Sequence, residues 1–126
     1  MATPPVFVKV DQVRPGTNGH TLLAKVLTSK TVRRKGRAVP AARQTRIEYL
    51  IGDETGCIVF IAPNTQVDLL KPGNTIILHD ANIDMSKGIM KLVVDRRGLV
   101  EVAGPASFDV NEHNNLSLVE YELVCI

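Results

Sequence analysis

The chain contains 126 residues, of which 44% are apolar and 4% are aromatic, and its formal net charge is +2 at pH 7. A chain of this length supports one domain with a single core, and no apolar run approaches the roughly 18 residues that a membrane-spanning helix requires. Two cysteines, Cys57 and Cys125, supply neither a disulfide framework nor a metal quartet, and the N-terminus lacks the pattern of a secretion signal. We therefore expect no membrane association and a reducing intracellular compartment, either the nucleus or the cytoplasm.

Charge is distributed unevenly along the chain. The stretch from Lys30 to Arg46, here called the basic segment, holds seven of the fifteen basic residues and no carboxylate, which leaves eight basic and thirteen acidic residues elsewhere. Residues 101–126, in contrast, contain five acidic residues and neither Lys nor Arg. Because phosphate contacts dominate non-specific affinity for nucleic acids, the basic segment predicts a polyanionic partner.

Apolar and polar residues alternate in five stretches that predict β-strands. These strands span residues 21–33, 46–51, 57–62, 75–85 and 89–95, and residues 99–102 continue the fifth strand past a glycine bulge. A tight turn over residues 52–56, whose glycines permit positive φ, joins the second and third strands into a hairpin. Asn64 caps a short helix over residues 65–70, between the third and fourth strands, and Lys71-Pro72-Gly73 ends it.

The two ends of the chain are less regular. Residues 1–5 contain two adjacent prolines and predict a flexible tail, whereas residues 6–13 form a segment that plugs one end of the core. Residues 6–104 form the main domain, and residues 105–126 are an acidic extension that packs on it. The extension's last apolar stretch fits both a helical stripe and, slightly better, the alternation of a strand from Ser117 to Leu123.

Three strands, a short helix and two further strands are the element order of an all-β OB fold, a five-stranded Greek-key barrel. The ligand face of such a barrel lies across the second and third strands, between the loop joining strands one and two and the loop joining strands four and five. The first loop coincides with the basic segment, and the second is Ser86-Lys87-Gly88 with further cations close behind. Two positive clusters flanking one groove predict single-stranded DNA or RNA, or a folded single strand such as a G-quadruplex, as the partner.

Four stretches of the chain resemble a known family. They are VRPGTNGHTLLAKVL, IGDETGCIVFIAP, LLKPGNTIIL and MSKGIMKLVV. They are similar to the single-OB single-stranded-DNA-binding proteins, which include archaeal forms and the OB-fold members of the eukaryotic SOSS complex. The likeness is greatest to small plant proteins of one OB domain, in which the ending NNLSLVEYELV recurs. The resemblance covers residues 6–124 and implies an OB fold, binding of single-stranded DNA or RNA, and no catalysis.

The sequence departs from that family at the positions where its members stack bases on aromatic side chains. The matching residues here are Pro63, Asn82, Ser86 and Val93, none of them aromatic. Because each base-stacking contact contributes about 1 to 3 kcal/mol, the loss of several leaves affinity that is modest, electrostatic and steeply salt-dependent.

The candidate nucleic-acid-binding residues are therefore mostly loop cations. They are Lys30, Arg33, Arg34, Lys35, Arg37, Arg43, Arg46, Tyr49, Lys87, Lys91, Arg96 and Arg97. Lys87 matches a binding residue of the family, and Lys91 shares its face by strand parity. Tyr49 is the one aromatic residue on a ligand-face strand, and its alternation with Glu48 and Leu50 is equally compatible with burial.

The sequence offers little support for an enzyme, a cofactor or a small-molecule substrate. The three histidines lack metal-ligand spacing, so no metal site is expected. Cys57 lacks an identifiable base and has the pattern of a packed small residue. Asp53 and Glu54 are adjacent in a hairpin turn, where a self-capping or solvated role is the simpler interpretation.

Two alternatives to simple strand binding follow from the same residues. Val59, Ile61 and Val93 place apolar surface on the ligand face by parity, which suits a protein-interaction adaptor that has lost base stacking. Alternatively, the acidic extension folds over the basic groove as an internal competitor, unless its alternating end completes the barrel instead.

Overall fold

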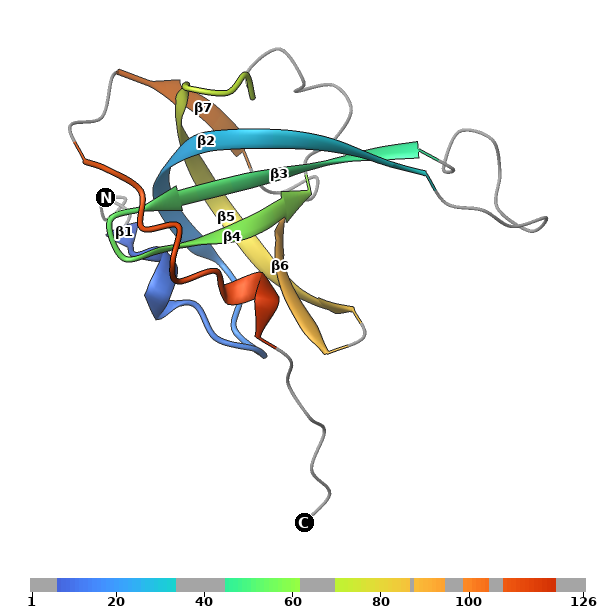
Figure 1. Ribbon diagram of the computed structural model, residues 1–126. Coiled ribbons are helices and arrows are strands. Elements are labelled where there is room, and N and C mark those ends of the chain that lie inside the picture. The colour runs from blue at the N-terminus through green and yellow to red at the C-terminus, as the bar shows by residue number, and fades with distance from the viewer. Residues whose placement is uncertain are drawn as a thin grey trace.

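The computed structural model describes residues 7–33, 45–61, 70–86, 88–94, 99–104 and 108–119, with the side chains at positions 32, 33, 45, 46 and 86 left undescribed. The strands are β1 (Phe7–Val8), β2 (His20–Arg33), β3 (Thr45–Asp53), β4 (Gly56–Ile61), β5 (Thr75–Ser86), β6 (Ile89–Val93) and β7 (Leu99–Ala103), as Figure 1 shows. Two 3-10 helices, η1 (Val10–Gln12) and η4 (Leu116–Leu118), complete the described elements. No helix among these residues is long and apolar enough to span a membrane.

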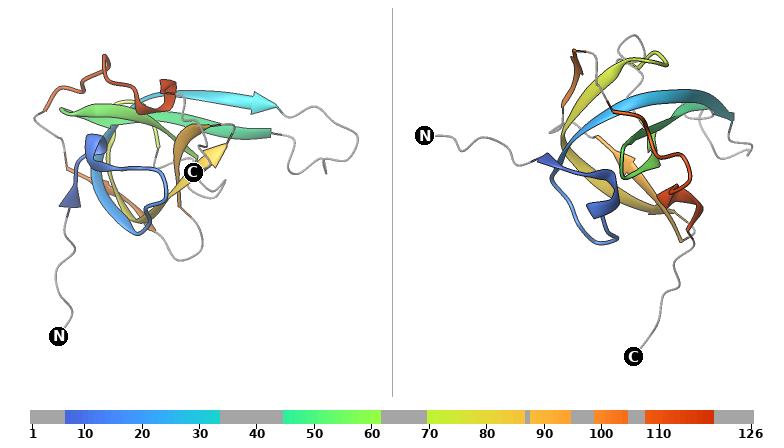
Figure 2. Two further views of the ribbon diagram at one scale, coloured as in Figure 1. Left: turned by 90° about the horizontal axis from the view of Figure 1, so that it is seen from below. Right: turned by 60° about the vertical axis from the view of Figure 1, so that its left-hand side comes forward.

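Five of the strands close a barrel. β2 pairs with β3, β3 with β4, β4 with β6, β6 with β5, and β5 again with β2. All of these pairings are antiparallel except the short parallel one between β4 and β6. Figure 2 shows these strands wrapping around a common interior. The predicted all-β five-stranded OB barrel is therefore confirmed, whereas the helix expected over residues 65–70 falls almost entirely outside the described residues.

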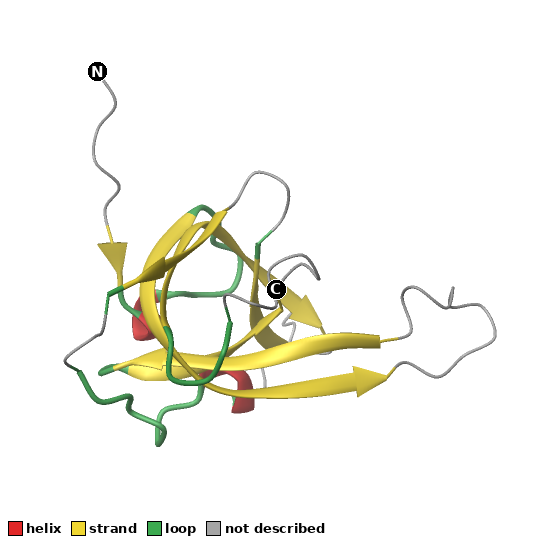
Figure 3. Ribbon diagram, turned by 90° about the horizontal axis from the view of Figure 1, so that it is seen from above, coloured by secondary structure: helices red, strands yellow, loops and turns green. Residues whose placement is uncertain are grey.

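β2 is long because its first half pairs with one strand and its second half pairs with another. Residues from His20 to Lys25 pair with β5, and residues from Lys25 to Arg33 pair with β3, with a register irregularity between Val26 and Thr28. Beyond the barrel, the ends of β2 and β3 continue as a two-stranded arm, which Figure 3 shows projecting from the other strands. The basic segment begins at Lys30 in β2 and ends at Arg46 in β3, both in this arm, whereas residues 34–44 lie outside the described residues.

The core consists of the inward residues of the barrel strands and of the N-terminal segment. The largest fully buried side chains include Phe60, Leu22 and Ile51. Val10 and Val13 are also fully buried and belong to the same cluster. The prediction that the N-terminal segment plugs one end of the core is thus confirmed, with β1 adding a parallel pairing to β2.

The described residues after β6 form one further strand and a 3-10 helix. Residues 99–103 form a strand of their own, β7, which resumes antiparallel pairing with β5 after β6 has ended. Leu116–Leu118, where a strand was slightly favoured, is a 3-10 helix instead, because the Asn115 side chain accepts a hydrogen bond from Ser117 N and caps a tight turn. Residues 120–126 lie outside the description.

The glycines of the 52–56 hairpin serve close packing, which corrects the expectation of positive φ. Positive φ occurs among the described glycines at positions 16, 19, 73 and 88. A Cβ atom added to Gly52 would lie 2.6 Å from Val110 Cγ1, and one added to Gly56 would lie 2.7 Å from the carbonyl oxygen of Asn114. The hairpin therefore needs glycine because residues 108–119, here called the C-terminal segment, press directly against its backbone.

Asp53 connects three segments of the chain by hydrogen bonds at the β3–β4 hairpin. Its side chain is fully buried and accepts hydrogen bonds from Val10 N at 2.9 Å and from Thr55 N at 2.8 Å, while its carbonyl accepts one from Asn111 N. One residue thus joins the N-terminal segment, the hairpin and the C-terminal segment. The neighbouring Glu54 forms an exposed ion pair with Lys9. The self-capping interpretation is confirmed for Asp53, which accepts hydrogen bonds from Thr55, and the exposed Glu54 fits the solvated one.

Candidate nucleic-acid interface

Strand register defines the outward side of β2, β3, β4 and β6. Thr28 lies opposite Leu50, which lies opposite Val59; Lys30 lies opposite Glu48, which lies opposite Ile61. Because directly opposite residues share a face of the sheet, this surface, called the outer face, comprises Thr28, Lys30, Glu48, Leu50, Val59, Ile61, Lys91 and Val93. The intervening residues of β3, β4 and β6, such as Ile51, Phe60 and Leu92, are buried on the opposite side.

Aliphatic side chains occupy the middle of the outer face. Leu50, Val59, Ile61 and Val93 are all half-buried, and Ile61 lies beside Val93 in the parallel pairing of β4 with β6. The prediction that Val59, Ile61 and Val93 lie on one face is confirmed, whereas its role as a ligand face stays a prediction. Sequence reasoning missed Leu50 as an apolar member of this face, although Leu50 shares the strand parity of Glu48. We call these four residues the aliphatic floor.

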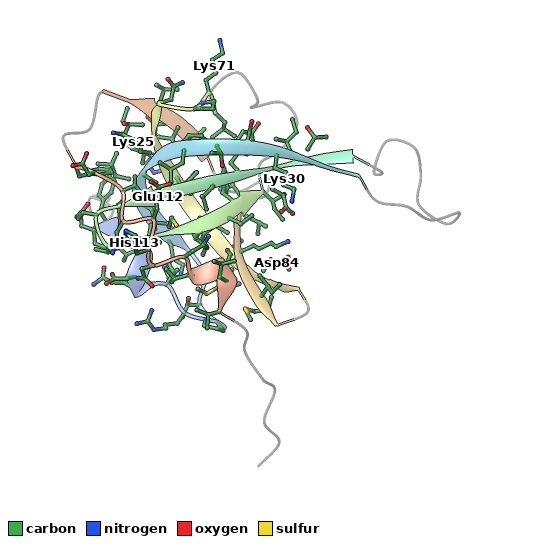
Figure 4. The ribbon with its side chains drawn as sticks, viewed as in Figure 1. Lys25, Lys30, Lys71, Asp84, Glu112 and His113 are labelled. Carbon is green, nitrogen blue, oxygen red and sulfur yellow. The ribbon has the colours of Figure 1, made fainter. Side chains whose placement is uncertain are left out.

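Lys30 is the cation of the basic segment whose side chain lies among the described residues. Its side chain is exposed on the outer face and forms no ion pair with any described residue. Figure 4 shows Lys30 near the start of the arm. The backbone of Arg33 and Arg46 lies in β2 and β3, but their side chains are outside the description. So are Arg34, Lys35, Arg37, Arg43, Lys87, Arg96 and Arg97, whose roles remain predictions.

Lys91 lies on the outer face, as strand parity predicted, but its charge is compensated. Its Nζ lies 3.2 Å from Oε2 of Glu48, and the two side chains are only 15% and 14% exposed. The pair connects β6 to β3 across the intervening strand β4. Sequence parity placed each residue on a face but gave no sign of their contact, which joins positions 43 residues apart.

Tyr49 is buried and does not offer its ring to a base. Its exposed fraction is 3%, it lies opposite Phe60 on the core side of β3, and burial raises the pKa of its hydroxyl. Among the described residues, the hydroxyl has no hydrogen-bond partner. Of the two interpretations of Tyr49, burial of the ring is the one observed, because Tyr49 shares the face of Ile51, which the hydrophobic core covers; the residue nevertheless borders the pocket described next.

A pocket of about 200 Å³ opens on the outer face. Its lining residues come from β2, β3, β4 and the C-terminal segment, and they are Thr28, Lys30, Glu48, Tyr49, Leu50, Val59 and Asn115. Neither Asn82 nor Val93, two of the positions matching the family's stacking residues, contributes to it. Asn115 and Thr28 were absent from the predicted site, since nothing local in the sequence indicates that the C-terminal segment reaches β4.

The C-terminal segment is bonded into the barrel where β4 and β6 diverge. Cys57 N donates to the carbonyl of Asn114, and Val59 N donates to Ser117 Oγ, which in turn donates to the carbonyl of Met90. The described part of the extension thus closes a seam of the sheet. The prediction that the acidic extension competes for the basic groove can therefore apply only to residues 105–107 and 120–126, which lie outside the described residues.

Cys57 and the metal-ligating residue types are the remaining candidates for chemistry in the described part of the chain. Burial raises the pKa of the Cys57 thiol, so the nucleophilic thiolate is disfavoured there. Among the described residues, no three His, Cys, Asp or Glu side chains are grouped to hold a metal ion.

Comparisons with known proteins agree with this architecture. Residues 13–102 match the sequence model of a family described as single-stranded DNA binding protein Ssb-like, OB fold. An uncharacterized Arabidopsis thaliana protein is 54% identical over 134 residues, which cover 95% of this chain and 84% of the relative.

Two solved structures extend the comparison. The solution structure of a hypothetical Arabidopsis thaliana protein has a TM-score of 0.82 and 52% identity, covering 100% of this chain and 92% of that one. A chain of a Replication Protein A heterotrimer bound to single-stranded DNA has a TM-score of 0.65 at 20% identity, covering 95% of this chain and 28% of that one. The second likeness shows the fold alone.

Proposed function

The chain belongs to the Ssb-like OB-fold family, and we propose that it is a non-catalytic module that binds single-stranded nucleic acid across the outer face. The observation that carries this proposal is the position of Lys30. Lys30 is exposed and lies beside the aliphatic floor. It is also the first residue of the basic segment, which holds seven basic residues and no carboxylate. One surface thus combines an apolar area for bases with a source of positive charge for phosphates.

The balance between these two contributions follows from the side chains present. Aliphatic residues exclude water from a base but lack the aromatic face that gives about 1 to 3 kcal/mol per stacked base. Lys91 adds little attraction because Glu48 compensates its charge. The cations of the basic segment therefore supply most of the affinity, which is modest and falls steeply with salt.

Titration of labelled oligonucleotides tests this proposal. Single-stranded DNA, single-stranded RNA, a G-quadruplex and duplex DNA are compared by fluorescence anisotropy, starting at about 50 mM salt. We expect binding to single strands, with log K falling by about 0.7 per log unit of salt for each phosphate contact. Absence of binding to every ligand at low salt would refute the proposal, and a nearly flat salt dependence would refute its electrostatic basis.

Charge-removal variants locate the interface. Replacing Arg34, Lys35 and Arg37 together by Ala should weaken binding of all sequences alike, and Lys30→Ala should act in the same direction. Lys71→Ala is the matched control, because Lys71 is an exposed lysine that Figure 4 shows away from Lys30. Equal losses in Lys30→Ala and Lys71→Ala would mean that only the net charge matters.

The aliphatic floor also supports a second candidate, a protein-interaction adaptor. Four half-buried aliphatic side chains on one face suit an apolar peptide as well as a row of bases. Ile61→Asp places a charge in the middle of this floor. If it abolishes recovery of a protein partner while nucleic-acid binding is absent from the wild type, the adaptor function holds and strand binding does not.

A further inference from the structure

The pocket on the outer face has a floor and a rim of different chemistry. Leu50 and Val59, which are directly opposite each other on β3 and β4, provide the apolar floor. Lys30 and Glu48 lie on one side, and Asn115 from the C-terminal segment lies on the other. A shallow apolar surface with polar groups at its edge matches a planar ring that carries hydrogen-bonding atoms on its periphery.

The size of the pocket limits its occupant to one such ring system. A cavity of roughly 150 Å³ in another protein holds a benzene molecule, and the present pocket measures about 200 Å³. The pocket is therefore large enough for one nucleobase.

Asn115 has one group left for a ligand. Its Oδ1 accepts a hydrogen bond from Ser117 N at 2.9 Å, which holds the amide in place. Its Nδ2 donates no hydrogen bond within the described part of the chain. An amide fixed through its oxygen and open at its nitrogen can donate to a carbonyl oxygen or ring nitrogen of a base.

We propose that this site, the Asn115 pocket, holds one base of the bound strand, with the ring over Leu50 and Val59 and the adjoining phosphate beside Lys30. The inference rests on the proposed function. It favours a nucleotide over an apolar peptide side chain because the pocket opens beside an exposed lysine at the base of the basic segment. It also places a base contact away from Asn82 and Val93, where the family's stacking residues would lie.

A cycle that changes both the protein and the ligand tests this inference. Short single strands of about six nucleotides, within the site size of an OB fold, each carry one abasic position in turn. For the wild type, we expect one position at which removal of the base weakens binding about two- to tenfold, the range of a single net hydrogen bond with some apolar contact. For Asn115→Ser, we expect weaker binding of the intact strand and a much smaller further loss at that position.

Each variant should keep the domain folded, so that a loss of binding reports on the pocket. Serine preserves a capping oxygen for the Ser117 amide while removing the amide donor. Leu50→Ala removes part of the pocket's apolar surface, and Leu99→Ala makes the same change at an exposed position of β7, outside the outer face. Thermal unfolding of each variant verifies that the domain remains folded.

The outcomes separate the inference from the function on which it rests. If the wild type binds intact strands but no abasic position matters, or if Leu99→Ala and Leu50→Ala weaken binding equally, the pocket assignment is overturned and strand binding stands. If the wild type binds no strand at low salt, both are overturned. Displacement of a bound strand by an apolar peptide, with loss of that effect in Leu50→Ala, would reassign the pocket to a peptide.

Discussion

The ammonium of Lys91 and the carboxylate of Glu48 lie 3.2 Å apart on the outer face, and both side chains are largely buried. The contact joins β3 and β6 over the strand between them, so the centre of the expected binding surface is close to neutral. A lysine that sequence parity assigns to phosphate binding is thereby held by a carboxylate of the same protein. The middle of the outer face therefore carries little net charge, whereas Lys30, near the start of the arm, is exposed.

Removing the carboxylate should strengthen nucleic-acid binding. Glu48→Gln leaves the positive charge of Lys91 uncompensated on the outer face, so we expect tighter binding of single strands at low salt. The salt dependence should also become steeper, by about 0.7 for one added phosphate contact. Glu112→Gln, an exposed charge removal on the C-terminal segment, is the control for net charge. Unchanged or weaker binding by Glu48→Gln alone would contradict the compensating role of this pair.

Ser117→Ala should destabilise the barrel. The Ser117 hydroxyl accepts from Val59 N at 2.9 Å and donates to Met90 O at 2.7 Å, where β4 and β6 diverge. Without it, two backbone groups lose their partners, and we expect the free energy of unfolding to fall by about 1 to 3 kcal/mol. Urea unfolding measures the change. Ser29→Ala, at an exposed position of β2, should change it by no more than about 0.5 kcal/mol; similar losses in both would argue against the seam.

Gly56→Ala should separate the C-terminal segment from the hairpin. The added Cβ would lie 2.7 Å from the carbonyl oxygen of Asn114, so either β4 or the segment must shift, at a cost of about 1 to 3 kcal/mol. Gly104→Ala is the control, because no atom of the described residues lies within 4 Å of the corresponding Cβ. Hydrogen exchange at the Cys57 amide, which donates to Asn114, should accelerate only in the first variant. A fully protected amide in Gly56→Ala would show that the close approach is not required.

Tyr49→Phe should leave nucleic-acid affinity unchanged and stability equal or higher. A buried hydroxyl without a partner costs about 1 to 3 kcal/mol, and phenylalanine preserves the ring in the core. The pH dependence has a defined sign. Since burial raises the pKa of Tyr49 above its ordinary value of 10.0, the unfolded chain ionises first as pH rises. The wild type should therefore lose stability above about pH 10 relative to Tyr49→Phe.

Unfolding of the two proteins at neutral and alkaline pH checks this expectation. The contribution of Cys57, whose pKa burial also raises, is common to both and cancels in the comparison. A constant difference between the two proteins across this range, or weaker strand binding by Tyr49→Phe, would contradict the buried position of the ring.

The sequence by itself determined the features that depend on neighbouring residues. Period-two alternation located the five barrel strands, and glycine with polar residues indicated two hairpin turns. The clustering of seven cations in one segment can be seen directly in the order of the residues. The order of these elements predicted the OB fold, the resemblance to the single-OB family implied the same fold, and the closed β2–β3–β4–β6–β5 barrel confirms it. The roles of most of these cations stay predictions, since their side chains lie outside the described residues.

Only the tertiary structure decided how distant positions meet. Alternation shows that Tyr49 and Glu48 face opposite sides of β3 but not which side is the core, because that depends on how the sheet closes. The Lys91–Glu48 pair, the close approach of Asn114 to Gly56, and the pocket shared by Leu50 and Asn115 join segments 43 to 65 residues apart. Such contacts have no local pattern, because the energy of burying or pairing a side chain depends on what the folded chain brings to it.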